Sequence, residues 1–206
     1  DDPFSNQYPY YYWKEFLRSI SLYDIVFAYR PKNISEYSEL GARKVVLLPP
    51  WYDSTITYPA PSFNSDGEQI YSHDLVFIGH YENDGRVEYI KSLVREGLDV
   101  GLYGPEWNKK IRNDSTLKRF YPVRYLNIEE CNRVLCASKM ALVIYSKFNN
   151  DVYTRRCFEI PATGTMMIAK RTSDMMRLFQ EEEEIIFFNK TEELINKSKY
   201  YSNNIN

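Results

Sequence analysis

Short runs of apolar, β-branched and aromatic residues recur along the chain, with helical patterns between them. The runs cover 25–29, 45–48, 75–78, 100–103, 141–145, 166–169 and 185–188. Most of them are continuously apolar, as strands are when both faces of a sheet are covered. This alternation is the signature of parallel βαβ units. We therefore predict an α/β fold with a parallel sheet flanked by helices.

The segments between these runs carry apolar residues at helical spacing. One stripe over 87–94 ends at Gly97, and another over 131–135 follows an acidic first turn. A further helix is expected between Thr154 and Gly164, and a last one from Thr191. Pro161 lies inside the former and should kink it or end it early, because proline removes a backbone hydrogen bond.

A proline-rich stretch from Pro49 to Ser72 predicts a linker and a domain boundary. Only two candidate strands precede it, too few for an independent α/β sheet. Residues 1–55 are therefore expected to be the tail of a truncated Rossmann-like domain, and residues 56–206 a second domain.

Charge and cysteine content exclude several classes of function. With 26 Lys+Arg against 28 Asp+Glu, the chain lacks the basic excess of a nucleic-acid-binding protein. Cys131, Cys136 and Cys157, with His73 and His80, match neither a disulfide framework nor a metal site. No apolar run approaches the roughly 18 residues of a membrane helix, and no signal peptide is evident. We expect a cytoplasmic protein with no integral membrane segment and no metal ion.

Three turns directly follow predicted strands. They contain Gly79, Gly104 and the Asn149-Asn150-Asp151 triplet. Each turn taken alone is explained by residues that simply end a strand. Taken together, the three turns lie at the carboxyl ends of the strands, where α/β sheets bind ligands. Near this rim, His80 is either an acid–base group or a surface residue, and Arg86 either a phosphate ligand or a solvated first-turn residue.

The segment DVYTRRCFEIPATG is the richest in chemistry. It places Asp151, Arg155, Arg156 and Glu159 around the start of a helix. Arginines near a helix start can bind a diphosphate, and a carboxylate one turn on can accept hydrogen bonds from a ribose diol. The alternative is a solvated ion pair between Glu159 and either arginine. The usual nucleotide, hydrolase and zinc-protease motifs are absent.

Several segments together resemble a known family. They are YDIVFAY, VVLLPPWYD, DLVFIGHYENDGR, VGLYGPEW, RRCFEIPATG and EIIFFNKTEELINKSKYY. Their order and spacing resemble the spore-maturation CgeB-like glycosyltransferases, a group within the GT-B glycosyltransferases. The resemblance implies two Rossmann-like domains, of which the C-terminal one, from about residue 56, holds a nucleotide-sugar donor.

The resemblance also implies roles in the RRCFEIPATG region. Glu159 falls on the carboxylate that holds the ribose, and Arg156 on the family's arginine. Many related retaining enzymes carry a second glutamate before that carboxylate, with seven residues between the two. Asp151 occupies this position, with a side chain about one methylene shorter, and is our candidate for the sugar-facing catalytic residue together with Arg156.

Further donor contacts are implied at the other turns. Gly79 matches the turn near the diphosphate, with Arg86 as a phosphate ligand, and Gly104 matches the turn after the next strand. The loop 123–126, including Tyr125, lies where related enzymes contact the base.

We predict the donor half of a GT-B glycosyltransferase, which moves a sugar from a nucleoside diphosphate sugar to an unidentified glycan, protein or small molecule without a cofactor. The rivals are a non-catalytic Rossmann-like binding or assembly module and a GT-B epimerase. Because the acceptor side is expected to be truncated, this chain alone should bind a nucleotide sugar without transferring it.

Overall fold

The computed structural model of the chain describes residues 2–5, 10–61, 63, 65–67 and 71–205. The chain forms two compact units. The first comprises Asp1–Trp51 and Tyr145–Thr154, and the second comprises Tyr52–Ile144 and Arg155–Asn206. Asp1, where the predicted truncated domain begins, lies outside the described residues.

The first unit is built around two short parallel strands, β1 (Val26–Ala28) and β2 (Val45–Leu47), joined by α2 (Pro31–Glu39). Pro31 opens α2 at a position that tolerates a missing N–H. Before β1 lie 3₁₀ turns at Tyr10–Tyr12 and Ile20–Leu22 and the helix α1 (Lys14–Ser19). Four buried side chains form the core of this unit: Ile20, Val26, Ala28 and Tyr37.

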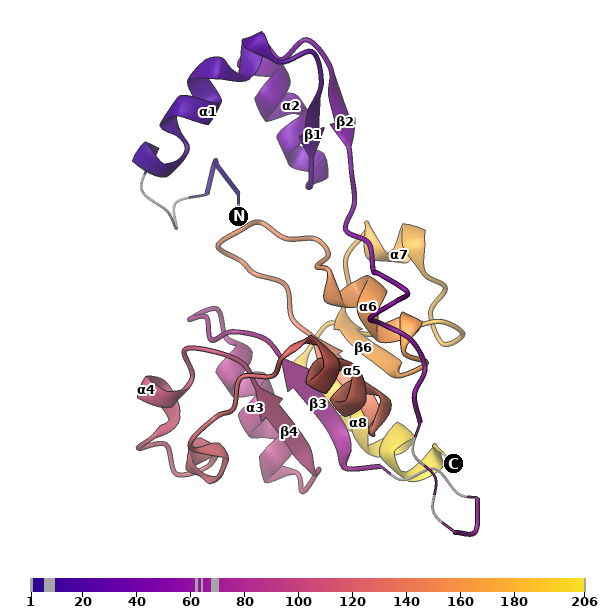
Figure 1. Cartoon of the computed structure of the whole chain (residues 1–206). Helices are drawn as coiled ribbons and strands as arrows, with labels where there is room; N and C mark the ends of the chain where they lie inside the picture. The colour runs from indigo at the N-terminus through magenta and orange to yellow at the C-terminus, as the bar shows by residue number, and fades with distance from the viewer. Residues whose placement is uncertain (1, 6–9, 62, 64, 68–70, 206) are drawn as a thin grey trace. The chain divides into compact units, whose positions relative to one another are not determined.

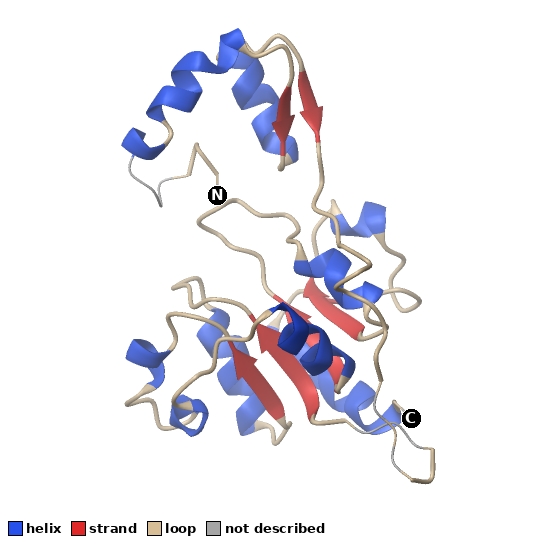
Figure 2. Ribbon diagram, viewed as in Figure 1, coloured by secondary structure: helices blue, strands red, loops and turns tan. Residues whose placement is uncertain are grey.

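The second unit holds a five-stranded sheet, shown in red in Figure 2. Its strands are β3 (His73–Ile78), β4 (Val100–Tyr103), β5 (Ser138–Val143), β6 (Met166–Lys170) and β7 (Ile186–Phe188). They lie in the order β4-β3-β5-β6-β7, and every neighbouring pair is parallel. The predicted fold class is confirmed.

Helices cover both faces of this sheet (Figure 1). They are α3 (Arg86–Arg95), α4 (Asn108–Ile111), α5 (Ile128–Cys136), α6 (Arg156–Ala162), α7 (Met175–Leu178) and α8 (Thr191–Asn204), with a 3₁₀ turn at Leu117–Phe120. Helices α3 and α8 contact each other and pack on one face, while α5 and α6 lie on the other. The core under α3 and α8 buries Leu75, Ile90, Met140, Ile168 and Leu194 completely.

Two local expectations are refined by the structure. The β5 strand begins at Ser138 and ends at Val143, earlier than the apolar run at 141–145 indicates. Helix α6 continues through Pro161 and ends at Ala162, beside Gly164, the glycine expected to stop it, so the early end expected from the proline is wrong.

The described part of the proline-rich stretch packs on the second unit. The backbone of Tyr58 donates to and accepts from the side-chain amide of Asn132, at 3.1 Å in both cases. The Ala60 N–H donates to the Cys136 thiol at 3.2 Å. Residues 52–61 therefore belong to the second unit, where they lie along α5.

Candidate functional site

The strand order of the second unit indicates where a ligand would bind, at the carboxyl ends of the strands, which we call the carboxyl edge of the sheet. The chain runs from β3 to β4 on one side and then crosses to β5 on the other side of β3. In open parallel sheets, ligands bind at the carboxyl ends of the strands where the winding direction reverses. Here the reversal lies between β3 and β5, so the residues of the second unit at the carboxyl ends of its strands form the candidate site.

Two glycines meet at this edge. The Gly79 N–H donates to the Tyr103 carbonyl at 2.9 Å, and a Cβ on Gly104 would lie 2.1 Å from the Gly79 oxygen. Gly104 also has a backbone φ of 133°, which residues other than glycine rarely adopt. The buried Trp107 indole N–H donates to the same Gly79 oxygen at 2.8 Å. The loops after β3 and β4 are thus joined through backbone that only glycine permits.

A buried ion network fills the loop after β3. The Arg86 guanidinium binds both oxygens of Asp84, at 2.7 and 2.8 Å, and one oxygen of Glu82 at 3.2 Å. All three residues are at most 6% exposed. His80 Nε2 lies 2.5 Å from the other Glu82 oxygen, and its own carbonyl accepts from Arg86. Arg86 therefore supports this loop from inside.

The loop after the 3₁₀ turn approaches the same edge. The Arg124 carbonyl accepts from the Gly104 N–H at 2.9 Å, and Val123 N–H donates to the Asn108 side chain at 2.8 Å. Tyr125, between these anchors and α5, is 73% exposed. This loop leads into a capping box in which Asn127 and Glu130 satisfy the first turn of α5.

Two arginines bind one glutamate where α6 begins. Arg155 Nε lies 2.7 Å from Glu159 Oε1, and Arg156 Nη1 lies 2.6 Å from Glu159 Oε2. Glu159 is 8% exposed, whereas the side chains of Arg155 and Arg156 are 55% and 31% exposed. Both ion pairs that the i,i+3 and i,i+4 spacing permits are present, around a carboxylate that is nearly buried.

Asp151 belongs to the first unit. Its Oδ1 accepts from Arg30 Nε at 2.7 Å and Nη2 at 2.6 Å, and both side chains are largely buried. Tyr153 donates its hydroxyl to the Tyr29 carbonyl at 2.8 Å, and the rings of these two tyrosines meet edge to face. The segment Tyr145–Thr154 is thus fastened within the first unit by a buried ion pair and an aromatic contact.

Comparison with known proteins identifies the family of the chain. A profile of the family described as Glycosyl transferase-like matches residues 86–205, more than half of the chain. The chain belongs to this glycosyl transferase-like family. None of the curated proteins compared with the chain matches it.

Solved structures share the fold of this glycosyl transferase-like chain. Sucrose-phosphate synthase from Thermosynechococcus elongatus is 14% identical, with a TM-score of 0.63 over 96% of this chain and 54% of that one. The Anabaena protein HepE, in complex with UDP-glucose, is 15% identical, with a TM-score of 0.60 over 86% and 53%. A mutant of the T4 phage protein BGT, also with UDP-glucose, is 16% identical, with a TM-score of 0.58 over 86% and 52%.

These likenesses bear on the fold. The predicted Rossmann-like architecture of the GT-B type is confirmed by these GT-B neighbours. The chain spans about half the length of each. Within the described residues, none of the helices combines the length and apolar character that crossing a membrane requires.

The structure gathers some of the predicted site residues of the glycosyl transferase-like domain and separates others. It brings Gly79 next to Gly104, and Arg155 and Arg156 around Glu159. It places Arg86 inside the loop after β3, Tyr125 at the surface and Asp151 in the first unit. Their roles toward a ligand stay predictions.

Sequence reasoning missed the partners of these residues. Asp84 stands two positions before Arg86, and Gly85 between them has a φ of 99°, so the triplet DGR was an available signal for a turn that pairs the two charges. A buried tryptophan usually donates its indole N–H to an acceptor, so Trp107 was also a signal for a hydrogen bond inside the fold. Nothing local in the sequence links Arg30 to Asp151, because 121 positions separate them.

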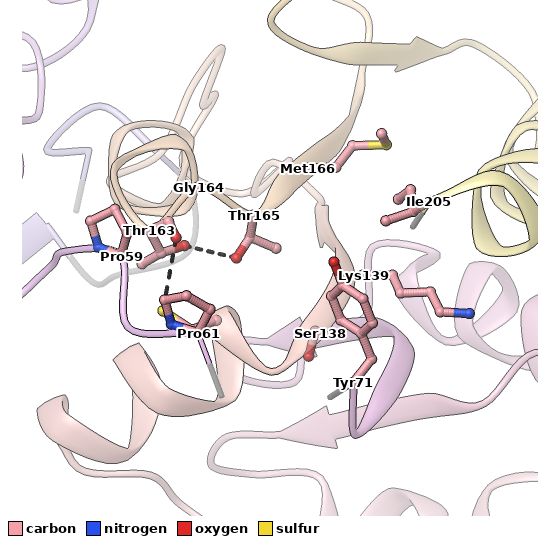
Figure 3. A pocket seen from close by; sticks show the side chains of 11 residues that line it. Pro59, Pro61, Tyr71, Ser138, Lys139, Thr163, Gly164, Thr165, Met166 and Ile205 are labelled. Carbon is pink, nitrogen blue, oxygen red and sulfur yellow. Dashed lines mark hydrogen bonds between the residues drawn. The ribbon is translucent and has the colours of Figure 1, made fainter. Parts of the chain in front are cut away.

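A cavity of about 280 Å³ lies at the opposite edge of the sheet (Figure 3). It is lined by Ser138 and Met166, the first residues of β5 and β6. The Thr163 hydroxyl donates to Thr165 at 2.9 Å, and the Lys139 ammonium binds a carboxylate and a backbone carbonyl. Because the cavity lies at the first residues of these strands, it is separate from the candidate site at their carboxyl ends. In the described part of the chain, no group of three or more His, Cys, Asp or Glu residues is arranged to hold a metal ion.

Proposed function

We propose that this chain is the donor-binding part of a CgeB-like GT-B glycosyltransferase, which transfers a sugar from a nucleoside diphosphate sugar to an acceptor. The observation that carries the proposal is the pair of arginines around Glu159 at the carboxyl edge of the sheet. UDP-glucose in the structures of HepE and of the T4 phage protein supports a uridine nucleotide as the first donor to test.

The chemistry suits these side chains. When the sugar leaves, the bond between its anomeric carbon and the diphosphate oxygen breaks, and the electrons stay on the diphosphate. The guanidinium groups of Arg155 and Arg156 stabilise that charge, because charged hydrogen bonds to phosphate are strong and bidentate. The arginines supply the compensating charge, so the proposal invokes neither a metal ion nor another cofactor. Glu159 is the acceptor for the ribose hydroxyls.

Other residues have supporting places in this proposal. Gly79 and Gly104 keep the edge clear of side chains, and the loop with Tyr125 lies beside them for the base. A sugar-facing role for Asp151, or a phosphate contact for Arg86, requires each to exchange a buried partner. The acceptor, whether a glycan, a protein or a small molecule, lies outside the proposal.

Thermal unfolding with a panel of ligands tests the proposal. UDP-glucose and UDP are compared with GDP, ADP and CMP, because a ligand at 100 times its Kd adds about 2.7 kcal/mol to the free energy of unfolding. Arg156→Ala should weaken UDP binding about tenfold or more. Arg95→Ala is the matched control, because Arg95 is an exposed arginine in the last turn of α3, at the opposite edge of the sheet.

The outcomes separate the rival functions. A rise in Tm with UDP-glucose that Arg156→Ala abolishes and Arg95→Ala preserves supports the donor site. A flat response to every nucleotide favours a non-catalytic module. Equal losses in both variants would show that the response reflects general charge rather than a site.

A further inference from the structure

The segment between β4 and α5 concentrates positive charge at the surface. Residues 105–124 contain six of the chain's 26 lysines and arginines but only two of its 28 acidic residues. The chain as a whole is slightly acidic, so this excess of positive charge is local. Five of the six cations are exposed side chains that we call the basic patch: Lys109, Lys110, Arg112, Lys118 and Arg119.

Apolar residues of the same segment fasten it to the core. Trp107, Ile111 and Leu117 are at most 1% exposed. Helix α4 contacts the 3₁₀ turn that follows it, and it lies beyond the edge strand β4 (Figure 1). The guanidinium carbon of Arg112 lies 6.0 Å from the centroid of the Tyr121 ring, which brings the two ends of the segment together. The basic patch is therefore displayed on packed structure.

Acidic side chains do not neutralise the basic patch. Within the described residues, none of its five cations forms an ion pair, whereas the sixth cation of the segment, Arg124, pairs with Glu130 at 2.7 Å. Asp114 lies between the cations in sequence, but it is bound by Lys91 of α3 at 2.6 Å. The other acidic residue, Glu106, is exposed before α4. Several solvated cations without counter-charges create a positive potential at this surface.

We propose that the basic patch docks the chain on an anionic lipid bilayer. Each lysine or arginine near a negatively charged membrane surface adds to the attraction, and long side chains can reach the headgroups with their charged ends. Tyr121, beside Arg112, is 47% exposed and supplies an amphipathic ring of the kind that lies at the level of the headgroups. This inference goes beyond the proposed function and does not depend on it.

The geometry favours a bilayer over a nucleic acid. Single-stranded nucleic acids bind where successive bases stack on open aromatic rings. Here Phe120 packs against the core, and the Tyr121 ring already has Arg112 over it. Duplex DNA is read by a helix or ribbon that enters a groove, whereas α4 is only four residues long. A lipid surface requires only exposed cations on one side of the protein, which the basic patch provides.

Flotation with lipid vesicles tests the docking. The 206-residue chain is mixed with vesicles of phosphatidylcholine, either alone or with about 30% phosphatidylserine, and we expect binding only to the anionic vesicles. Affinity should fall about tenfold or more between about 0.1 M and about 0.5 M salt, because salt screens exposed charges. A chain that does not bind the anionic vesicles at low salt would overturn the proposal.

A triple variant removes three charges from the basic patch. It combines Lys109→Gln, Arg112→Gln and Arg119→Gln. All three side chains are exposed, so the variant should keep the Tm of wild type to within a few degrees. We expect its affinity for the anionic vesicles to be about tenfold lower or less still.

The matched control removes the same charges elsewhere in the second unit. It combines Arg95→Gln, Arg133→Gln and Lys190→Gln, which are one lysine and two arginines exposed outside the basic patch. The two triple variants have the same net charge, and the control should bind anionic vesicles within about twofold of wild type. Equal losses in both variants would reduce the effect to net charge and overturn the docking.

A labelled oligonucleotide supplies the competing outcome. If the chain binds a single- or double-stranded oligonucleotide more tightly than vesicles with the same phosphate content, and the patch variant loses that binding, the patch belongs to a nucleic acid and the bilayer proposal is overturned. Tyr121→Ser should weaken vesicle binding about threefold, since it removes the interfacial ring. The rise in Tm with UDP-glucose is measured on the same proteins, so failure of the proposed donor site is seen separately from failure of the docking.

Discussion

Arg86 shows how a charged side chain can be buried without a ligand. Its guanidinium has two carboxylates and a backbone carbonyl as partners, and it is 3% exposed. The same side chain lies over the Phe77 ring, with its guanidinium carbon 5.9 Å from the ring centroid. The loop between β3 and α3 therefore depends on one cation for its internal order.

Replacing this cation should be costly. Arg86→Met leaves Asp84 and Glu82 buried without their partner, and we expect the free energy of unfolding to fall by about 3 to 5 kcal/mol. Urea denaturation measures the change. The exposed Arg95→Ala should stay within about 0.5 kcal/mol of wild type. A loss below about 1 kcal/mol for Arg86→Met would mean that the loop rearranges to hydrate both carboxylates.

At the scale of elements, every strand predicted from apolar runs is present. Strands such as β3, β4 and β6 are covered on both faces, so their apolar runs are continuous. A continuous apolar run in the sequence predicts such strands well. The start of β5 was missed because its first residues, Ser138 and Lys139, are polar. Helices α4 and α7 are each four residues long, too short for a periodic pattern.

The site was predictable only in part, for a related reason. The Arg155, Arg156 and Glu159 cluster follows from helical spacing, which is local in sequence. The Arg30–Asp151 pair and the Gly79–Gly104 approach come from tertiary packing of distant segments. Side-chain types and spacing carry no information about such contacts.

The join between the loops after β3 and β4 leads to a prediction at Gly104. Gly104→Ala places a Cβ against the Gly79 backbone, at a φ that also disfavours alanine. We expect a loss of about 3 kcal/mol or more in the free energy of unfolding. Gly97→Ala is the control, because Gly97 has a φ of 87° but open space around it, so it should lose about 1 kcal/mol. Equal losses at both glycines would show that conformation alone, without the close approach, sets the cost.

A charge network joins the residue after β6, the segment between α7 and β7, and helix α8. Arg171 binds both oxygens of Glu181, at 2.7 and 2.5 Å, and Lys197 of α8 lies 3.4 Å from one of them. The hydrogen bond from Arg171 is the main cause that holds the pKa of Glu181 below its ordinary value of 4.5, against the effect of burial. A lowered pKa means that this carboxylate stabilises the fold above about pH 4.5 and loses that effect as the pH falls through its folded value.

Glu181→Gln should therefore show a pH-dependent defect. At pH 7 we expect the variant to be about 1 kcal/mol less stable than wild type, because the pair is partly exposed. The difference should shrink toward zero as both proteins are brought below the folded pKa of Glu181. Parallel urea titrations between pH 3 and 7 measure it. A difference that is constant with pH would assign the defect to lost packing rather than to charge.

At the scale of the whole molecule, the first unit is discontinuous in sequence. Its segment Tyr145–Thr154 is tied to Asp2 by Asn149, at 3.2 Å, and by Asn150, at 2.9 Å. Burial alone would raise the pKa of the Asp2 carboxyl, but hydrogen bonds from Asn150 and other donors lower it below its ordinary value. The ion pair of Arg30 with Asp151 completes the attachment.

Arg30→Gln should loosen this attachment. Because a buried Asp151 then loses its charged partner, amide hydrogen exchange in 145–154 and in β1 should become about tenfold faster or more. Strands β3 to β6 serve as the internal reference and should not change. Arg43→Gln is the control, since Arg43 pairs with Asp24 at the surface of the same unit. Unchanged exchange in 145–154 would mean that the tyrosine and asparagine contacts hold the segment without the ion pair.

The discontinuity of the first unit also sets an order of events during synthesis. Residues up to Trp51 leave the ribosome before those of the second unit, but their own unit also includes Tyr145–Thr154. By then the strands β3, β4 and β5 have already been made. Closing so long a loop costs entropy, which is smaller once the intervening chain has folded. The contacts of residues before Trp51 with 145–154 can thus form only after three strands of the second unit have been synthesised.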